Sequence, residues 1–323
     1  MKMNDHKQQL FVCIRSICFH VFIWLLVCSN LSSAVLVPEA PLILDYHNGP
    51  VLSASPIKVF LLFYGSFSNS EKSAIRAFLA STSAPAASKN SPSVSKWWSI
   101  TRGYVDSSGN GVAQQIALQR ERTDNKYSLG KQLTKSNLTS LVLRSLKFFP
   151  TDPNAVYLVL TDKHVYVEGF CQDFCGQHFY TYPSVKTQGK ALPYAWVGNS
   201  ETQCPGFCAW PYAKPLYGPP APPLVSPNGV GVDGLIITLA KVLAGAATNP
   251  FGNGYYQGDA TVALEAAGAC ASSYGPGSYP GYPGDLLKDS KTEASYNVQG
   301  IQSYKFLVPW IWNPATLSCA GQP

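Results

Sequence analysis

The stretch Ile57-Lys-Val-Phe-Leu-Leu-Phe-Tyr64 is nearly all apolar and is followed by Gly65 and Ser66. A strand with apolar side chains on both alternating sides has to be covered on both faces of its sheet. The run Ala155-Val-Tyr-Leu-Val-Leu160 has the same character. The two runs therefore predict two central, buried strands.

Segments with helical spacing of apolar residues surround these two runs. The strongest covers 231–247 and precedes Asn249-Pro250, a helix stop; its apolar residues at helical intervals are Leu235, Leu239, Val242 and Ala246. Shorter helices are expected at 70–80, at 134–149 and in the segment that carries Trp97 and Trp98. Three further runs predict strands at 112–119, 164–170 and 194–197.

Strands and helices alternate in the first half of the chain, which predicts an α/β or α+β fold in one domain. We expect a mixed central sheet flanked by helices, with a loop-rich C-terminal half. The Pro-rich stretch 211–227 has cysteines on both sides, so it is interpreted as a long loop within that domain. The Gly-, Tyr- and Pro-rich run 275–284 is interpreted as a surface loop.

The N-terminus has the order of a secretory signal peptide. Basic residues come first, an apolar run over 17–28 follows, and Ser32 and Ala34 place small residues before a cut after Ala34. The predicted organisation is a signal peptide at 1–34 and a single domain at 35–323. No later stretch is judged long and apolar enough to cross a membrane, so no span is expected after cleavage.

Composition excludes several classes of protein. Charged residues make up 13% of the 323 residues and hydrophobic ones 46%, which is incompatible with a disordered chain. The formal charge of +6 is spread without long Lys/Arg runs, so nucleic acid is not an expected partner. The chain is predicted to be a globular protein poor in charge.

Six cysteines remain after removal of the signal peptide: Cys171, Cys175, Cys204, Cys208, Cys270 and Cys319. An even number in a secreted chain predicts three disulfides and a disulfide-rich C-terminal half, although 15 pairings are possible. The spacing of the first four would also suit a four-thiolate zinc site, which the oxidising compartment disfavours. Both interpretations stay open at this point.

Segments along the whole mature chain resemble the EXORDIUM, or phosphate-induced, family of secreted plant proteins. The most specific is Gln203-Cys-Pro-Gly-Phe-Cys-Ala-Trp-Pro211. Others are Tyr46-His-Asn-Gly-Pro50, Pro92-Ser-Val-Ser-Lys-Trp-Trp98, Tyr194-Ala-Trp-Val-Gly-Asn-Ser200 and Phe306-Leu-Val-Pro-Trp310. The resemblance implies an apoplastic or cell-wall protein involved in cell expansion and in growth responses to brassinosteroid and carbon status.

The resemblance also bears on catalysis. Some members of the family carry His-Glu-x-x-Glu where this chain has Lys241-Val-Leu-Ala-Gly245, and two such side chains four residues apart could hold one zinc ion. An ammonium group repels a metal, and Val242 and Gly245 supply no ligand. We therefore expect a degenerate zinc-peptidase-like fold, no metal or other cofactor, no catalytic residue and no enzymatic activity.

A hydrolase with an unrecognised site is the alternative. The mature chain has three histidines, His47, His164 and His178, and no Gly-x-Ser-x-Gly elbow. His178 follows Cys171 and Cys175 closely enough for a Cys-His dyad to be considered. Carboxylates such as Asp162, Glu168, Asp173 and Asp233 are also available, but Asp233 is interpreted as a helix-terminal residue that caps free backbone N–H groups.

Aromatic residues could stack on sugar rings, but packing in the core and in loops is the favoured interpretation, because large aromatic side chains are usually mostly buried. The adjacent Trp97 and Trp98 are preferred, because neighbouring helical side chains point about 100° apart. Other candidates are Tyr104, Trp196, Trp210 and Tyr212. Asn137-Leu-Thr139 is the only N-glycosylation sequon of the mature chain and predicts a glycoprotein if Asn137 faces solvent.

Taken together, the sequence predicts a secreted, disulfide-bonded protein of the extracellular space, located in the apoplast and cell wall. It is expected to regulate growth by binding a cell-wall polysaccharide or a cell-surface receptor rather than by catalysis. The sequence leaves its ligand and its oligomeric state open.

Overall fold

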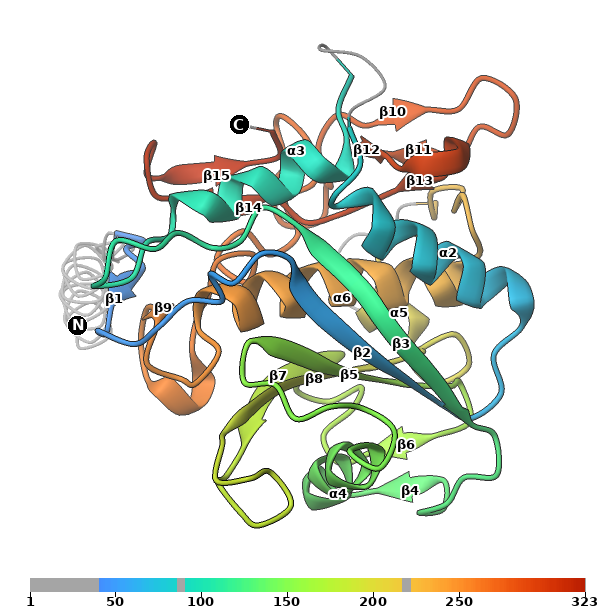
Figure 1. Cartoon of the computed structure of the whole chain (residues 1–323). Coiled ribbons are helices and arrows are strands. Elements are labelled where there is room, and N and C mark those ends of the chain that lie inside the picture. The colour runs from blue at the N-terminus through green and yellow to red at the C-terminus, as the bar shows by residue number, and fades with distance from the viewer. Residues whose placement is uncertain (1–40, 86–90, 217–221, 323) are drawn as a thin grey trace, which may run out of the picture. The chain divides into compact units, whose positions relative to one another are not determined.

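A five-stranded sheet forms the centre of the computed structural model, which describes residues 41–85, 91–216 and 222–322 (Figure 1). The predicted signal peptide at 1–34 and the first residues of the predicted domain lie outside the described residues. The strand order is β3-β2-β5-β8-β7. The strands are β2 Ile57–Tyr64, β3 Ile116–Asp124, β5 Ala155–Thr161, β7 Gly176–Thr181 and β8 Leu192–Gly198.

The sheet is mixed, as predicted. Strands β3, β2, β5 and β8 are parallel, and β7 pairs antiparallel with β8 at one edge. The two runs that predict central strands are β2 and β5, which lie next to each other. The expected strand at 112–119 begins later, as β3, and continues through the exposed charged residues Arg120–Arg122 because β3 is an edge strand. The antiparallel strand β7 was not predicted.

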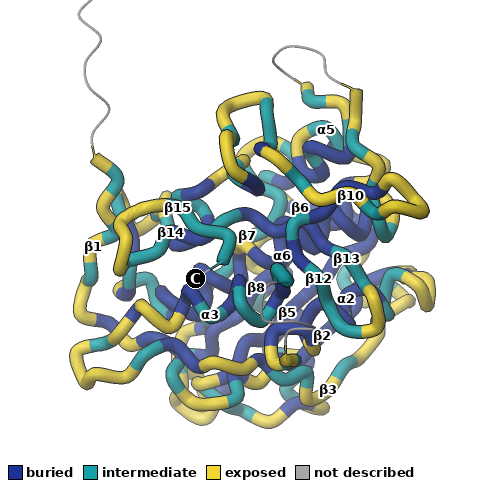
Figure 2. The backbone as a smooth tube through the Cα atoms, turned by 90° about the horizontal axis from the view of Figure 1, so that it is seen from above, coloured by how far each residue is buried: buried dark blue, intermediate teal, exposed yellow. Residues whose placement is uncertain are grey.

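Alternating side chains of the central strands enter two separate cores. Val59, Leu61 and Phe63 of β2 belong to a large core, whereas Phe60 and Leu62 belong to a smaller core. Figure 2 shows the central strands as the buried interior, with exposed segments around them. This two-sided burial explains why β2 lacks the polar alternation of a half-exposed strand.

Helices cover both faces of the sheet. The large core contains residues of α2 Asn69–Ser81, α3 Val94–Ser99 and α6 Val230–Thr248, and the smaller core contains residues of α4 Lys135–Ser145. The remaining helical elements are α5 Pro205–Cys208, η1 Ile100–Gly103, η2 Ala260–Val262 and η3 Ile301–Ser303. Each of the four predicted helical segments is therefore present.

Short strand pairs form the rest of the chain, mostly in its C-terminal part. They are β1 Asp45–Tyr46 with β9 Tyr255–Tyr256, β4 Gln132–Leu133 with β6 Tyr166–Val167, β10 Leu287–Lys288 with β11 Ser295–Tyr296, β12 Val298–Gln299 with β13 Lys305–Phe306, and β14 Ile311–Asn313 with β15 Ser318–Ala320. This part is loop-rich, as expected.

Helix α6 corrects the expectation that no later segment could span a membrane. By length and composition alone α6 passes that test. However, 89% of its apolar window is buried within the molecule. A helix that is apolar on all sides suits the core of a large soluble domain equally well, and α6 packs against β7 and β8.

Three disulfides are present, the number that six cysteines predict. They join Cys171 to Cys204, Cys175 to Cys208 and Cys270 to Cys319. The sulfur atoms of Cys171, Cys175, Cys204 and Cys208 are therefore paired in two disulfides, so none of them is a free thiolate. This excludes the four-thiolate zinc site and the Cys-His dyad in this structure. Disulfides form and persist in oxidising compartments, so the three bridges indicate a protein of the secretory pathway.

The structure places Trp97 and Trp98 in the core, the favoured interpretation, and contradicts a role for them in stacking on a ligand. Both indoles are 1% exposed and belong to the large core. The Trp97 ring N–H donates to the carbonyl of Pro309, and that of Trp98 to the carbonyl of Ala113. Adjacent side chains on a helix point about 100° apart, but the short helix α3 is covered on more than one side. Both adjacent rings can therefore be buried.

Asn137 lies in the first turn of α4, where its side chain closes a capping box. Its Oδ1 accepts a hydrogen bond of 2.9 Å from the backbone N–H of Thr134, while the Thr134 hydroxyl accepts one from the Asn137 N–H. The sequon is thus on a helix, as expected, and glycosylation of this partly buried residue stays a prediction.

Removal of the Cys270–Cys319 disulfide should reduce stability strongly. This bridge closes a loop with a sequence separation of 49 residues. Loop-closure entropy predicts that the double substitution Cys270→Ala and Cys319→Ala lowers the free energy of unfolding by about 4 kcal/mol. Chemical denaturation of the purified protein measures this loss, and a change below about 1 kcal/mol would contradict the loop-closure account.

Candidate functional site

A partly buried, hydrogen-bonded pair of side chains, His178 and Glu265, joins the edge strand β7 to the segment that follows α6. The His178 Nε2 lies 2.9 Å and 2.7 Å from the two carboxylate oxygens of Glu265. The side chains are 11% and 17% exposed. His178 pairs with Ala195 of β8, whose side chain belongs to the large core, so its imidazole lies on the face of the sheet that α6 covers.

Asn249 extends this pair to the end of α6. Its Nδ2 donates a hydrogen bond of 2.7 Å to Glu265 Oε1, and its Oδ1 accepts one of 2.6 Å from the backbone N–H of Gly254. Each carboxylate oxygen of Glu265 therefore has a hydrogen-bond partner. The three side chains together connect β7, the C-terminus of α6 and the loop beyond it.

Gly245 has no side chain, and this leaves room on α6 for the His178–Glu265 pair. A Cβ atom at this position would lie 2.5 Å from Glu265 Oε2 and 2.9 Å from His178 Nε2, which is closer than real Cβ contacts. Any side chain here would displace the pair. In the family resemblance this is the position of the second glutamate of His-Glu-x-x-Glu, so the structure gives a steric reason for its absence from this chain.

Lys241 lies on α6, one helical turn before Gly245. Its side chain is exposed, yet the surrounding protein atoms withhold enough water that desolvation lowers the pKa of the amine, an effect that the Glu265 carboxylate opposes. Among the described residues its ammonium group has no hydrogen bond and no ion pair closer than 4 Å. Lys241 is therefore available to an anionic ligand.

The pKa of Glu265 is lowered despite its environment. Burial alone raises it, but the charge and hydrogen bonds of His178 and Asn249, together with the charge of Lys241, more than compensate. The cluster thus holds an ionised carboxylate. Within the described ranges, no three His, Cys, Asp or Glu side chains are placed to hold a metal ion.

The other residues considered for catalysis lie apart from this cluster. His47 stacks on Tyr256 at a centroid distance of 3.7 Å. Asp162 is 1% exposed and accepts hydrogen bonds from the Ser66 N–H and the Tyr127 hydroxyl. Its role is to tie together backbone at the ends of β2 and β5.

Asp233 is a buried carboxyl group in the first turn of α6. It accepts hydrogen bonds of 2.8 Å from the backbone N–H and 2.7 Å from the Nδ2 of Asn228. Burial raises its pKa to about 7, although the bonds from Asn228 work in the opposite direction. Asp233 therefore fixes the entry to α6 structurally; the N–H group it binds precedes the helix rather than belonging to it.

A groove with a volume of about 440 Å³ lies between the Pro-rich loop and the 275–284 run. Apolar and polar side chains both line it, among them Trp210, Pro211, Leu224, Tyr282, Asp285 and Lys288. Of the six aromatic candidates, Trp210 alone is not classed as buried. Its indole packs against Tyr274 with a centroid distance of 5.9 Å.

The walls of the groove are held in place covalently and by close backbone packing. Trp210 follows α5, which the Cys175–Cys208 disulfide ties to the start of β7. On the opposite wall, a Cβ at Gly284 would lie 2.2 Å from the carbonyl oxygen of Gly275. The two ends of the 275–284 loop therefore approach each other as closely as only glycine permits. The Tyr282 hydroxyl donates to Asp285 at 2.6 Å.

The chain belongs to a known family of plant proteins. The conserved region of phosphate-induced protein 1 matches residues 44–322, and the chain is therefore a member of the phosphate-induced protein 1, or EXORDIUM, family. No solved structure shows significant similarity to it.

Plant proteins of this family are similar over most of their length. The chain is 43% identical to the protein PHOSPHATE-INDUCED 1 of Nicotiana tabacum, covering 90% of this chain and 91% of that protein. It is 43% identical to EXORDIUM-like 2 of Arabidopsis thaliana, with coverage of 90% and 93%, and 42% identical to EXORDIUM of the same plant, with 86% and 88%.

Sequence reasoning considered His178 for a Cys-His dyad and Lys241 only as the replacement of a metal ligand, and it did not single out Glu265. Glu265 is 87 residues from His178, and no local pattern marks a pair at that separation. The groove was missed for a similar reason, because its walls come from two loops. Its one signal was Trp210, which lies within the most specific family segment, 203–211.

The pH dependence of stability should report the buried Asp233. Its folded pKa of about 7 exceeds the usual 3.8, so between these values the folded chain binds a proton that the unfolded chain has lost. Raising the pH from 4 to 7 should therefore lower the free energy of unfolding, by up to about 4 kcal/mol. Asp233→Asn should flatten this slope in urea denaturation; an unchanged slope would exclude Asp233 as its source.

Glu265 should act in the opposite direction at lower pH. Its folded pKa lies below the usual 4.5, so the stability it contributes is present above that value and is lost as the pH falls through the folded pKa. Glu265→Gln should cost about 3–5 kcal/mol at pH 7 by leaving His178 without its carboxylate. Glu293→Gln on the surface is the control, and an equal loss in both variants would refute the prediction.

Proposed function

We propose that this protein acts in the apoplast and cell wall as a growth regulator that binds a wall glycan rather than catalysing a reaction. The observation that carries the proposal is the groove beside Trp210. An aromatic face with a polar rim suits a pyranose ring, whose faces are apolar and whose edge carries hydroxyl groups. Asp285 and Lys288 supply that rim.

Different observations support the proposed extracellular location and the proposed role in growth. The three disulfides indicate the secretory pathway, and the predicted signal peptide at 1–34 leads in the same direction. The role in cell expansion, with responses to brassinosteroid and carbon status, rests on family membership. A cell-surface receptor is the alternative partner to the glycan.

The structure of the histidine cluster supports binding over catalysis. His178 Nε2 is occupied by Glu265, and Asn249 holds the same carboxylate while bonding to the backbone of Gly254. These contacts occupy His178 Nε2 and both carboxylate oxygens of Glu265, and the second ring nitrogen of His178, Nδ1, is buried from solvent. The cluster thereby connects secondary-structure elements, which is a sufficient reason for its presence.

A hydrolase remains the second candidate, and one observation favours it. The Lys241 amine, with its lowered pKa, lies near a partly buried His–Glu pair whose His178 Nδ1 has no hydrogen-bond partner in the described part of the chain. Turnover of peptides or wall glycans by the purified protein, abolished by His178→Ala, would establish this alternative and overturn the binding proposal.

Substitution of Trp210 should remove glycan binding. On an array of neutral cell-wall oligosaccharides, Trp210→Ala should lose about tenfold or more in affinity, because the stacking face disappears. Tyr282→Ala on the opposite wall should weaken binding to the same ligand. Tyr182→Ala removes an aromatic ring that is 69% exposed outside the groove and is the control. Unchanged binding by the Trp210 variant would contradict the proposal.

A further inference from the structure

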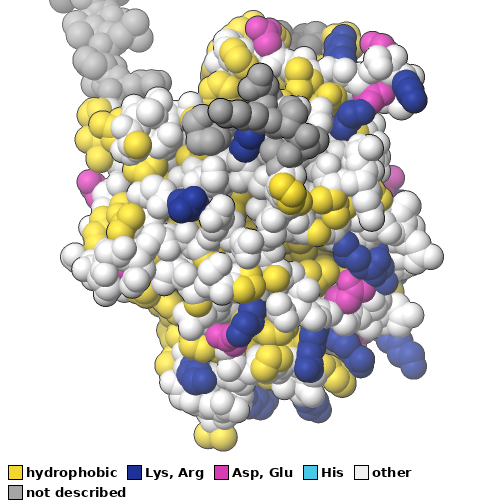
Figure 3. All heavy atoms as spheres, turned by 45° about the horizontal axis from the view of Figure 1, so that its top comes forward, with side chains coloured by type: hydrophobic (Ala, Val, Ile, Leu, Met, Phe, Trp, Pro, Cys, Tyr) yellow, Lys and Arg dark blue, Asp and Glu magenta, His cyan; other side chains and the backbone are white. Residues whose placement is uncertain are grey.

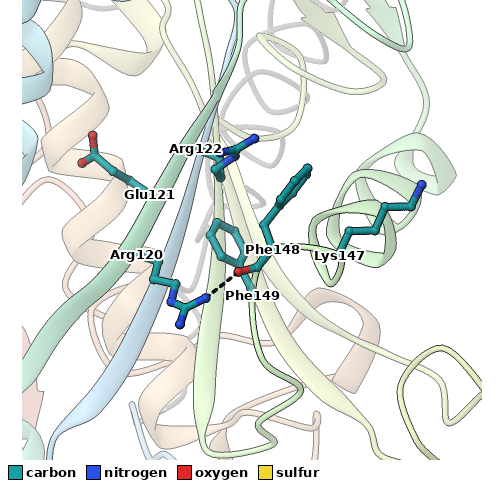
Figure 4. Close-up of a pocket in the computed structure, with 6 residues that line it drawn as sticks. All are labelled: Arg120, Glu121, Arg122, Lys147, Phe148 and Phe149. Carbon is teal, nitrogen blue, oxygen red and sulfur yellow. Dashed lines mark hydrogen bonds between the residues drawn. The ribbon is translucent and has the colours of Figure 1, made fainter.

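A cleft separate from the Trp210 groove lies beside the edge strand β3. It has a volume of about 540 Å³ and is lined by Arg120, Glu121, Arg122, Lys147, Phe148 and Phe149. The first three come from β3, and the last three follow α4 (Figure 4). It shares no residue with the Trp210 groove.

Contacts with Phe148 fix both arginines. The Arg120 guanidinium donates a hydrogen bond of 2.9 Å to the Phe148 carbonyl, and the Arg122 guanidinium lies 4.0 Å from the centre of the Phe148 ring. The Phe148 side chain is exposed at 49%, whereas its neighbour Phe149 is 3% exposed and packs on Phe60 at 5.4 Å. The buried ring thus anchors a segment that presents an exposed ring.

The charge of the cleft is positive. Strand alternation turns Glu121 to the other face, where Arg76 binds its carboxylate with hydrogen bonds of 2.8 Å and 2.6 Å. Figure 4 shows Glu121 directed away from the two arginines. Arg120, Arg122 and the exposed Lys147 remain without a neutralising carboxylate among the lining residues. Figure 3 shows Lys and Arg side chains gathered on the lower half of one face.

We propose that this cleft binds a linear acidic polysaccharide whose sugar rings carry carboxylates. A guanidinium group binds a carboxylate through two parallel hydrogen bonds, and the Phe148 ring offers a flat face to a pyranose. The juxtaposition of guanidinium groups with an exposed aromatic ring is the combination that such a repeating unit requires. Lys147 contributes a further positive charge for the next carboxylate along the chain.

A nucleic acid also combines anionic groups with flat rings. The three disulfides place the protein in the secretory pathway, where a glycan is the more suitable occupant of the cleft. The polysaccharide is therefore the proposed ligand, and a nucleic acid becomes an outcome of the experiment.

The test uses the purified, disulfide-bonded chain and polygalacturonate as the probe, with affinity measured by biolayer interferometry at low and moderate salt. We expect binding that weakens as salt rises. Fully methyl-esterified polygalacturonate keeps the rings and removes the charges, so it should bind at least about tenfold more weakly. Equal binding of the ester would overturn the proposal.

Variants then locate the site. Arg122→Gln combined with Lys147→Gln should weaken polygalacturonate binding about tenfold or more, and Phe148→Ala should weaken it as well. Lys147→Gln alone changes an exposed residue without a role in packing, so its smaller loss tests the proposal even if the other variants fold poorly. Lys186→Gln, in the exposed loop after β7 at the other edge of the sheet, is the matched charge control.

Two outcomes would refute the assignment: an equal loss in the Lys186 control, or tighter binding of a single-stranded DNA oligonucleotide than of polygalacturonate. Trp210→Ala separates this site from the proposed function, because that variant should retain polygalacturonate binding. If the wild-type protein does not bind neutral glycans but binds polygalacturonate, the groove proposal is overturned and the cleft proposal stands.

Discussion

Burial of the parallel strands on both faces is the constraint on which the rest of the structure depends. Strands β2, β5 and β8 send alternate side chains into two cores, so each face needs its own cover. Helices α2, α3 and α6 supply one cover and α4 the other. Two of the polar features lie at the edges of the sheet, the histidine pair at β7 and the basic cleft at β3.

Local patterns predicted the parts of the fold that local physics determines. The apolar runs at β2 and β5, the helical spacing of α6 and the mixed sheet follow from side chains close together in sequence. Strand β7 was missed because Gly176–Thr181 carries no clear apolar alternation, and the predicted strand at 112–119 stops short of the charged residues of β3 because the apolar alternation ends there. Trp97 and Trp98 were misassigned because burial depends on neighbours from distant segments.

The sites show the same division. Position 241 and His178 could be selected from residue type, but Glu265 could not, because only the fold brings it to His178. The cysteine count predicted three bridges without their pairing, which places α5 beside β7 and thereby sets one wall of the Trp210 groove. Residue type thus indicates which groups are available for chemistry, and topology decides which of them meet.

The missing Cβ of Gly245 couples positions that are far apart in the sequence. A larger residue at 245 is compatible with the fold only if the side chain at 265 or 178 becomes shorter or turns away. Substitutions at these three positions are therefore epistatic: a change that is tolerated in one background is excluded in the other. Relatives within the family should consequently fall into two groups, with either a small residue at this helix position or an altered pair opposite it.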